Sequence, residues 1–475
     1  MAAQWIMREK DKRQKPNPRI ETYLEILKRD NLLYKASKQC LKQLDESDKK
    51  MYAVCWAPAL VEYVMWVLTE ALQDKQERLY FLARDAYPMY LIAQQIVTKF
   101  NIGIEIRYLR VSRYSLRIPE YHLLGEKCLD RIFLSGIDVS LYQILKRAEL
   151  SEEEMYQVEK EIHYRRPLKQ NLNPKEITEI KKQVLVCCRE GSTNLLNMIY
   201  THSRDAYANA LGYLKQEGLL DSIRYAVVDS GWVGTIQKSI RTLLAQERPE
   251  IHIQGYYFGL YELPEERNGC TYKAFYFRPE RDIQRKVEFS NCLYEVMYSE
   301  ACPMVKKYVW NMGQYEPVFS KVDNPNKENL NINHQVLLLY MENLMKLEKE
   351  TDIKNWYKND AKELVQQLYR TIMANPNKWE AQWYGSQLFS DDLADDHMRC
   401  IANDLNQTEI RNLRISTKLL IMAGVLHREL HESGWIEGTI VNAGKHIASN
   451  LRGARRAKYV TYLRQSLKAG KTKEV

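Results

Sequence analysis

The feature that most constrains the fold is an alternation of short apolar runs with helical patterns. Apolar runs stand at residues 79–83, 104–111, 224–229 and 251–261, and helical patterns follow at 90–97 and 235–245. A strand, a helix and a second strand joined in this way form a right-handed crossover unit, and such units build a parallel sheet. Runs without polar alternation fit strands buried on both faces. The sequence therefore predicts an α/β fold with a central parallel sheet and helices on both faces.

Longer helical patterns surround this predicted sheet. Residues 123–218 are charged and helical by pattern, and we interpret them as an insertion. Ser151, followed by three glutamates, and Asn173-Pro174 have the composition of helix N-caps. The expected organisation is a helical N-terminal arm at 1–50, a sheet core at 51–122 and 219–300, a helical insertion at 123–218, and a helical C-terminal region with a basic tail at 301–475.

The most apolar stretch, residues 51–72, approaches the length needed to span a bilayer. It contains Pro58, Glu62 and Glu70, and a strand pattern follows almost at once, so we expect a buried helix. The N-terminus has no long apolar segment typical of a signal peptide. The nine cysteines form no Cys-x-x-Cys pair, which fits reduced thiols and a cytoplasmic location.

The charge pattern suggests an anionic partner. The formal net charge is +9, which suits phosphates, a membrane surface or nucleic acid, and is also compatible with a soluble protein that is simply basic. The tail from residue 443 is basic, and it carries apolar residues roughly on one helical face: Ile447, Leu451, Tyr459, Tyr462, Leu463 and Leu467. We expect either a peripheral contact with the inner face of the cell membrane or a terminal helix packed by its apolar stripe.

The stretch YAVVDSGWVGT, residues 225–235, places an acid at a strand end and a glycine-rich turn behind it. Gly231 and Gly234 permit tight turns. The amides of residues 231–235 would lie at the N-terminus of the next helix, where the helix dipole favours an anion, and Thr235 adds a hydroxyl. The spacing is neither that of a Walker A loop nor that of a dinucleotide-binding turn. It predicts a phosphate cradle, or else an ordinary capped strand-to-helix turn, and we expect bulk at Gly234 to block a phosphate.

Polar side chains follow three of the predicted strands. Arg84 and Asp85 come after the first, Arg113 after the second, and Asp229 ends the third. In open parallel sheets, ligands bind beyond the carboxyl ends of the strands. The sequence therefore predicts that these groups converge on one site.

Two of these segments resemble the type I phosphoribosyltransferases. The apolar run, acid and glycine-threonine loop resemble the loop that binds phosphoribosyl pyrophosphate (PRPP), and LARDAYPMYLIA resembles the pyrophosphate loop and the helix after it. The usual Arg-Gly-Gly is Arg84-Asp85-Ala86 here, and Ser230 replaces the second acid of the usual pair. The loop is also about two residues shorter. These departures disfavour a nucleotide-salvage enzyme.

The chain is more similar to proteins encoded in bacterial capsule and O-antigen gene clusters. These carry FLSRDGY-like, Tyr-x-x-x-Ser-Arg and D-x-GW-x-GT segments, and this chain has YFLARDAY, YLRVSR and DSGWVGT within residues 50–300, with NPNKWEAQWYG as a weaker match. The resemblance implies a Mg²⁺-dependent enzyme that moves 5-phosphoribose from PRPP to a hydroxyl of a lipid-linked glycan and releases pyrophosphate. A haloacid-dehalogenase-like phosphatase partner would then remove the 5-phosphate, because this chain has no Asp-x-Asp phosphatase motif.

The resemblance also implies roles for individual residues. Asp229 would bind the ribose hydroxyls, and Asp85 would hold magnesium; both are catalytic candidates. The base that activates the acceptor stays open between Asp85, Asp229, Glu288 and Glu295, and the segment holding the two glutamates is otherwise a surface helix. The 5-phosphate would lie on Ser230, Gly231, Trp232, Val233, Gly234 and Thr235, and the pyrophosphate on Arg84, Ala86 and Arg113.

Two other functions compete with this one. The first is a glycan enzyme that uses a nucleotide-sugar on a similar sheet. The second is a non-catalytic protein that binds PRPP or nucleic acid, with phosphate contacts from the basic tail. The presence of Arg84, Asp85 and Arg113 on the pyrophosphate side favours the enzyme, and nucleic acid is the least favoured partner.

Overall fold

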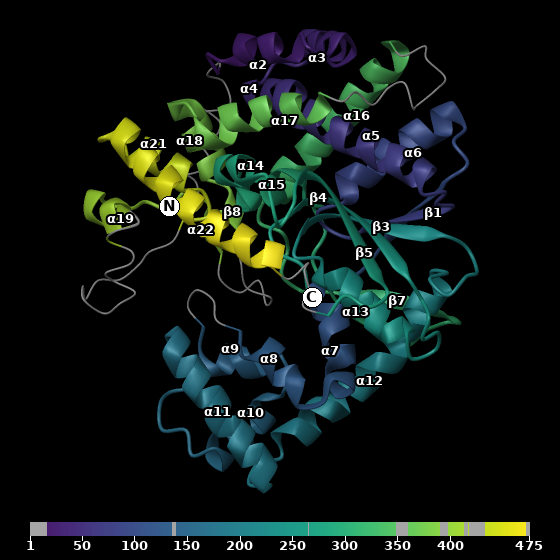
Figure 1. Cartoon of the computed structure of the whole chain (residues 1–475), viewed down its shortest axis with the longest axis vertical. Coiled ribbons are helices and arrows are strands. Elements are labelled where there is room, and N and C mark those ends of the chain that lie inside the picture. Colours follow the sequence, from purple (N-terminus) through teal and green to yellow (C-terminus); the bar gives the residue numbers. More distant parts are fainter. Residues whose placement is uncertain are drawn as a thin grey trace.

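The central element of the fold is a five-stranded parallel sheet with the order β2-β1-β3-β4-β5 (Figure 1). The computed structural model describes residues 17–134, 139–264, 266–347, 360–389, 398–412, 417 and 433–471. The α/β class and the parallel sheet are therefore as predicted. The strands are β1 (Arg78–Leu82), β2 (Glu105–Leu109), β3 (Tyr225–Trp232), β4 (Ile253–Leu260) and β5 (Cys270–Phe277).

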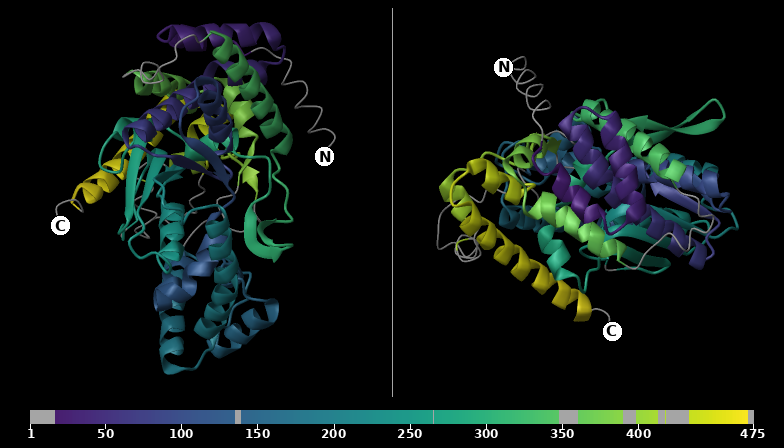
Figure 2. Two further views of the ribbon diagram at one scale, coloured as in Figure 1. Left: turned by 90° about the vertical axis from the view of Figure 1, so that its right-hand side faces the viewer. Right: turned by 90° about the horizontal axis from the view of Figure 1, so that it is seen from above.

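Helices cover both faces of the sheet, because alternate side chains of each strand point to opposite sides. In β1, Leu79 and Phe81 belong to the hydrophobic core that contains α5 (Ala57–Gln73) and α6 (Tyr87–Phe100). Tyr80 and Leu82 pack on the other face. The helices there are α7 (Arg113–Leu124), α12 (Leu195–Gln216) and α13 (Thr235–Leu244). Figures 1 and 2 show the resulting three layers.

The apolar segment expected to be a buried helix is one. It continues from α4 (Ser47–Met51) through a π-helical turn, η1 (Tyr52–Trp56), into α5. The span Ser47–Gln73 is long and apolar enough to cross a membrane, yet its most apolar window is buried completely inside the protein. Glu62 is buried with it. This burial is that of a core helix.

The stretch predicted as an insertion forms helices with a hydrophobic core of its own. Ser151 and Asn173 both cap helices as predicted, each through a reciprocal capping box. The insertion extends from the sheet as a separate lobe in Figure 1. Its helices are α8 (Cys128–Ile132), α9 (Leu141–Lys146), α10 (Glu152–Glu161), α11 (Pro174–Glu190) and the first part of α12, after the short turn η2 (Gly125–Lys127).

The region 301–475, expected to be helical, also contains two antiparallel strand pairs. Strands β6 (Val305–Asn311) and β7 (Gln314–Phe319) form an antiparallel hairpin, and Met312 and Gly313 at its turn both have positive φ. Strands β8 (Leu388–Phe389) and β9 (Arg399–Cys400) form a short pair. The helices are α16 (Lys327–Leu347), α17 (Ala361–Tyr369), η4 (Arg370–Ala374), α18 (Lys378–Gly385), α19 (Gln407–Asn412), α21 (Ile436–Ala443) and α22 (Ile447–Lys471).

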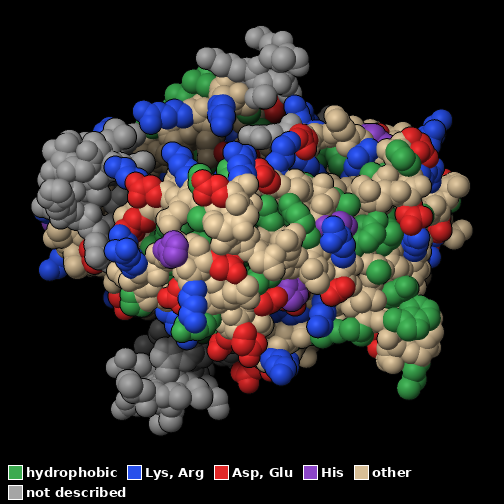
Figure 3. All heavy atoms as spheres, turned by 90° about the horizontal axis from the view of Figure 1, so that it is seen from below, with side chains coloured by type: hydrophobic (Ala, Val, Ile, Leu, Met, Phe, Trp, Pro, Cys, Tyr) green, Lys and Arg blue, Asp and Glu red, His purple; other side chains and the backbone are tan. Residues whose placement is uncertain are grey.

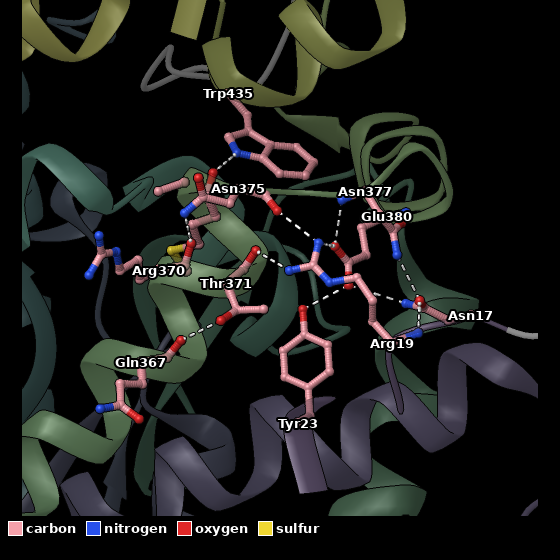
Figure 4. Close-up of polar contacts among 12 residues, drawn as sticks. Asn17, Arg19, Tyr23, Gln367, Arg370, Thr371, Asn375, Asn377, Glu380 and Trp435 are labelled. Atoms are coloured by element: carbon pink, nitrogen blue, oxygen red, sulfur yellow. Dashed lines mark hydrogen bonds and ion pairs between the residues drawn. The ribbon is translucent and has the colours of Figure 1, made fainter. Parts of the chain in front are cut away.

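A partly buried ion pair, Arg19–Glu380, joins the N-terminal arm, with α2 (Ile20–Leu27) and α3 (Asn31–Gln43), to the C-terminal helices (Figure 4). The carboxylate of Glu380 is fully buried, and it accepts hydrogen bonds from Asn17 Nδ2 (3.2 Å), Arg19 Nη1 (3.2 Å) and the Tyr23 hydroxyl (2.7 Å). The backbone amide of Asn377 also donates to it (2.8 Å). Glu380 lies in the NPNKWEAQWYG segment, so this segment has a structural role in the fold.

Removing Arg19 should therefore destabilise the protein. In Arg19→Ala the buried Glu380 carboxylate keeps only neutral partners, and breaking such a pair costs about 3 kcal/mol of unfolding free energy. The matched control is Lys28→Ala, whose ion pair with Glu25 lies on the exposed surface of the same arm and should leave the unfolding free energy nearly unchanged. Urea unfolding measures both. Equal losses in the two variants would contradict a special role for the buried pair.

The surface mixes charges of both signs. Viewed from below, lysine and arginine side chains are interspersed with aspartates and glutamates over the described part of that face (Figure 3). A duplex nucleic acid is bound by a continuous basic stripe, so this face does not favour nucleic acid. The β6–β7 hairpin projects from the molecule (Figure 2) and exposes Trp310 and Met312.

Candidate functional site

A pocket of about 230 Å³ lies at the carboxyl edge of the sheet, where β1 and β3 end. From β1 the chain passes through α6 to β2 on one side, whereas α13 leaves β3 on the opposite face. Neighbouring strands whose connections leave in opposite directions form a crevice, the usual ligand site of open α/β sheets. Most predicted site residues line this pocket: Arg84, Asp85, Arg113, Asp229, Ser230, Gly231, Trp232, Val233, Gly234, Thr235 and Glu295.

Two predicted site residues lie elsewhere. Ala86 is fully buried at the start of α6 and does not line the pocket. Glu288 ends α14 (Ile283–Glu288), where its carboxylate is occupied by Gln284, Gln366 and Arg370. Neither side chain is placed to contact a ligand in this pocket, so Glu288 drops out as a candidate base.

The turn after β1 is strained and rigidly held. Arg84 has φ 77°, a left-handed conformation that residues other than glycine seldom adopt. Its amide donates to the Tyr108 hydroxyl (3.1 Å), which itself donates to Glu300 (2.6 Å), and the Glu300 amide donates to the Arg84 carbonyl (3.0 Å). Strained residues of this kind cluster at functional sites, where the surroundings hold them in place.

Strand β3 is longer than expected, and the turn after it is correspondingly short. β3 continues to Trp232, three residues past the predicted strand end at Asp229, and Gly231, Trp232 and Gly234 all have positive φ. A Cβ on Gly231 would lie 2.2 Å from the Gly259 carbonyl oxygen, and one on Gly234 would lie 2.6 Å from the Tyr272 ring. Bulk at Gly234 would thus strike Tyr272 rather than fill the pocket. The glycines serve the turn and the sheet, which corrects the reason that the sequence suggested for Gly234.

Helix α13 begins at Thr235, inside the lining of the pocket. No side chain in the described ranges caps this helix. The first amides of a helix have no partner within the helix, and the helix dipole adds partial positive charge there. This end of the pocket is therefore suited to an anion, as the phosphate-cradle interpretation requires.

Three carboxyl groups also line the pocket: Asp85, Asp229 and Glu295. Asp85 accepts hydrogen bonds from the hydroxyls of Ser230 (2.9 Å) and Ser299 (3.2 Å). Burial, and then the Asp85 charge, hold the pKa of Asp229 well above its usual range. Burial and Asp85 also raise the pKa of Glu295 to about 7, although the Trp232 indole donates to its carboxylate at 2.5 Å. Clustered carboxyls with raised pKa values are typical of proton-transfer and cation-binding sites.

Two arginines supply positive charge from α7. Arg113 is the first residue of the helix, and Arg117 follows one turn later. Both line the pocket, and neither forms a hydrogen bond or ion pair with any residue that the structure describes. Arg113 was predicted from the sequence and Arg117 was not, although a spacing of four residues on a helix places both on one face.

A scan against profiles of known protein families and a search of curated proteins both find no match for this chain. The chemistry of the pocket is therefore inferred from its own residues.

The donor set suits a magnesium ion bound together with a phosphate ligand. Within the described ranges, no three Asp, Glu, His or Cys side chains group as a preformed metal site. Mg²⁺ usually takes only one or two protein carboxylates and completes its shell with water and substrate phosphates. Asp85 and Asp229 face one pocket that also carries arginines able to bind phosphate, so they fit this second mode of binding.

A second hollow adjoins the pocket. It shares Arg84, Glu295, Met304 and Phe389 with the first and continues toward Ser299, Cys302 and Asn326. Glu295 thus lies on the wall common to both spaces. Met304 and Phe389 come from segments remote in sequence, and no local pattern could have identified them.

Proposed function

We propose that this protein is a phosphoribosyltransferase that transfers 5-phosphoribose from PRPP to a hydroxyl group of a glycan. One observation carries the proposal. A single pocket at the switch point of the parallel sheet is lined by a helix N-terminus, by clustered carboxyls and by two arginines, Arg113 and Arg117. Neither arginine has a hydrogen-bond or ion-pair partner among the described residues. PRPP offers a monophosphate, ribose hydroxyls and a pyrophosphate. The helix N-terminus and the arginines are suited to its phosphates, and the carboxyls are suited to its hydroxyls. The resemblance of the DSGWVGT and LARDAY segments to phosphoribosyltransferase loops adds support, and with it a phosphoribosyltransferase-like core.

Each wall of the pocket has a role in this proposal. The amides of the turn 231–235 and the Thr235 hydroxyl bind the 5-phosphate. Asp229 accepts hydrogen bonds from the ribose hydroxyls. Arg84 and Arg113 bind the departing pyrophosphate, since guanidinium groups pair well with phosphate oxygens. As the C1–pyrophosphate bond breaks, positive charge develops on the ribose ring, and the nearby carboxylates stabilise it.

Asp85 is the residue that would hold magnesium. When bound, the ion neutralises charge on the pyrophosphate leaving group. The hydroxyls of Ser230 and Ser299 keep the Asp85 carboxylate oriented. This positioning from two separate segments, β3 and the end of α15 (Asn291–Tyr298), supports a functional carboxylate at the turn after β1.

Glu295 is the base we favour among the open candidates. It lies between the larger pocket and the adjoining hollow, so an acceptor entering from the hollow would bring its hydroxyl past this carboxylate. A base works best when its pKa lies near the working pH, and the pKa of Glu295 is raised to about 7 by burial and by Asp85. The acceptor oxygen attacks C1, its proton passes to Glu295, and pyrophosphate leaves.

The experiment that tests the proposal is incubation with PRPP, Mg²⁺ and lipid-linked glycan acceptors, with products read by mass spectrometry. The expected product is the acceptor carrying one phosphoribosyl group, with equimolar pyrophosphate. Omission of PRPP and omission of Mg²⁺ are the controls. Failure to bind PRPP in calorimetry would reject the donor. Removal of the 5-phosphate is assigned to a separate haloacid-dehalogenase-like phosphatase, so the phosphate should stay on the product.

We further propose that the enzyme works in the cytoplasm and meets its lipid-linked acceptor at the membrane through α22. Part of the predicted apolar stripe is used inside the protein, since Tyr462 stacks on Tyr261 and Leu451 packs near α21. The outer face exposes Tyr459 and Leu467. Basic side chains flank these two on the same exposed face: Arg452, Arg456, Arg464 and Lys468.

Mutating this face should weaken binding to anionic vesicles. Each Lys or Arg near such a surface contributes about 1 kcal/mol, so Arg456→Gln combined with Arg464→Gln should reduce co-sedimentation with phosphatidylglycerol vesicles by roughly ten-fold or more. Neutral phosphatidylcholine vesicles are the control, and added salt should release the parent protein. Binding that is unchanged by the double variant and by salt would contradict a membrane role for α22.

A further inference from the structure

Arg117 is a cation without an anion among the described residues. It lies in the second turn of α7, half-buried, with its side chain in the lining of the pocket. It forms no hydrogen bond or ion pair with the residues that the structure describes. Burial lowers its pKa to about 10, and the charges of Arg113 and Arg147 act in the same direction. Withdrawing a guanidinium from water without a partner is unfavourable, so this position calls for a negatively charged ligand.

The surroundings of Arg117 do not supply that negative charge. Its charged neighbours are arginines: Arg113 and Arg147 oppose its charge, and Arg117 in turn helps to lower the pKa of Arg131, after burial. Arg147 donates to the carbonyls of Ile132 and Leu134. The insertion thus brings a surplus of positive charge to the edge of the pocket.

The nearby carboxylate of Glu120 already has other partners and does not pair with Arg117. It is fully buried, it pairs with Arg131, and it accepts a hydrogen bond from Ser239 Oγ at 3.1 Å. Glu120 also fixes how α7 lies against α13. It comes one turn after Arg117 on α7, and Ser239 comes one turn after Thr235 on α13.

Arg117 and Arg113 therefore serve different ends of the pocket. Glu120 on α7 contacts Ser239 on α13, so Arg117 and Thr235, each one turn earlier on its helix, come near each other in the pocket lining. Arg113, by contrast, acts on the carboxyls, because its charge lowers the pKa of both Asp229 and Glu295. Beside Arg117 the positive end of the α13 dipole adds to the arginine charge. A dianion bound there would neutralise the arginine charge and interact favourably with the helix dipole.

We propose that Arg117 binds the terminal phosphomonoester of the donor at the N-terminus of α13 and makes the pocket selective for 5-phosphorylated pentoses. The inference rests on the proposed function and deepens it by naming the group that recognises the donor. A phosphomonoester carries close to two negative charges near neutral pH, which suits a guanidinium and a helix N-terminus acting together. A nucleotide-sugar has only a diphosphate diester, so it would leave Arg117 unpaired.

Calorimetry with ribose 5-phosphate, pyrophosphate and UDP-glucose tests this assignment. Arg117→Gln should weaken ribose 5-phosphate binding roughly 10- to 100-fold, the range for a lost charge-assisted hydrogen bond. The Arg117→Gln variant should change the dissociation constant for pyrophosphate by less than about three-fold. Arg113→Gln is the matched control on the same helix face and should show the reverse pattern. Arg117→Lys should recover part of the affinity, and UDP-glucose should bind the parent weakly.

Thermal melting supplies a second readout that a purely structural role would not give. Without ligand, Arg117→Gln should melt at or above the parent temperature, because an unpaired cation has been removed. With ribose 5-phosphate the parent should gain stability by mass action, and the variant should gain almost none. A variant that melts below the parent and still gains the full ligand-induced increase would identify Arg117 as a packing residue and overturn the inference.

The outcomes separate this inference from the proposed function. If Arg117→Gln binds ribose 5-phosphate like the parent, the inference is overturned while PRPP transfer stands. If Arg117→Gln weakens both ligands equally, the charge acts on the whole pocket and the assignment to the monophosphate is wrong. Arg117-dependent binding of ribose 5-phosphate without any transfer from PRPP would keep the inference and reject the proposed function. A parent that binds neither probe would overturn both.

Discussion

The Asp229→Asn variant is expected to fold, to melt at a higher temperature than the parent, and to lose nearly all phosphoribosyl transfer. Asp229 is buried on β3 and faces Asp85 and Glu295 in the pocket. An amide has almost the same shape and cannot ionise, so the substitution keeps the packing and removes a charge. In the proposed reaction it also removes the carboxylate that binds the ribose hydroxyls and faces the developing positive charge. A loss of roughly 100-fold or more in turnover follows from that role.

The gain in stability follows from the direction of the pKa shift. Burial, and then Asp85, raise the pKa of Asp229 in the folded protein. Between the unfolded pKa near 4 and the raised folded value, the folded state therefore binds more protons than the unfolded state. The contribution of Asp229 to the free energy of unfolding of the parent is therefore lost as pH rises through that window. The amide of the Asp229→Asn variant has no such dependence, so the difference in melting temperature should widen from pH 5 toward pH 8.

Two further variants make the test specific. Asp85→Asn should also lose transfer and should weaken the dependence on Mg²⁺. Asp205→Asn, at an exposed aspartate on α12, should leave transfer and melting temperature unchanged. Mass spectrometry of the product and thermal melting from pH 5 to 8 give both readouts. If Asp229→Asn transfers phosphoribose at the parental rate while folded, this pocket does not perform the reaction.

The sheet was predictable because β1, β3 and β4 are buried on both faces. β1 and the first half of β3 carry continuous runs of apolar residues, 79–82 and 225–228, which a surface segment or an amphipathic helix would not carry. β5 was missed although its second half is buried, because its first half, CTYK, is partly exposed and reads as a loop. The β6–β7 hairpin was missed inside a long helical region. Its turn, Asn311-Met312-Gly313-Gln314, places a glycine at positive φ and was the available signal.

Only those residues of the candidate site that follow directly after a strand could be predicted from the sequence. A parallel sheet places the residues after β1, β2 and β3 at one edge, so Arg84, Asp85, Arg113 and Asp229 meet in one pocket. The side chains of Arg117 and Glu295 reach the same pocket from helices, whose orientation depends on tertiary packing. Glu288 and Glu295 were equivalent in sequence, and only the packing of α14 and α15 separates them.

That separation leads to an expected pH profile for Glu295. If Glu295 is the base, it must be ionised in the free enzyme before it can accept the proton of the acceptor hydroxyl. Its pKa is raised to about 7 by burial and by Asp85. The parental kcat/KM should therefore rise about ten-fold per pH unit below pH 7 and level off above it. Glu295→Gln should lose this rise and should reduce kcat roughly 100- to 10,000-fold, the usual contribution of a general base.

Glu288→Gln is the matched control. Glu288 is a buried glutamate in the neighbouring helix, and its carboxylate is bound by Gln284, Gln366 and Arg370 outside the pocket. This variant should keep the parental rate and the same pH profile. If the rise toward pH 7 persists in Glu295→Gln, another group is the base, and Asp229 or Asp85 would take the role.

Trp232→Phe tests the same titration by changing the pKa of Glu295 while keeping its carboxyl group. The Trp232 indole donates to the Glu295 carboxylate at 2.5 Å and lowers its pKa. Phenylalanine keeps an aromatic ring in contact with Phe277 and Phe289 but cannot donate. The ionised form of Glu295 then loses a hydrogen bond, so the rise in kcat/KM should move to higher pH. Because Glu295 still ionises in this variant, the plateau rate at high pH should approach that of the parent. A shift to lower pH, or a uniform loss at every pH, would show that the indole acts on something other than the ionisation of Glu295.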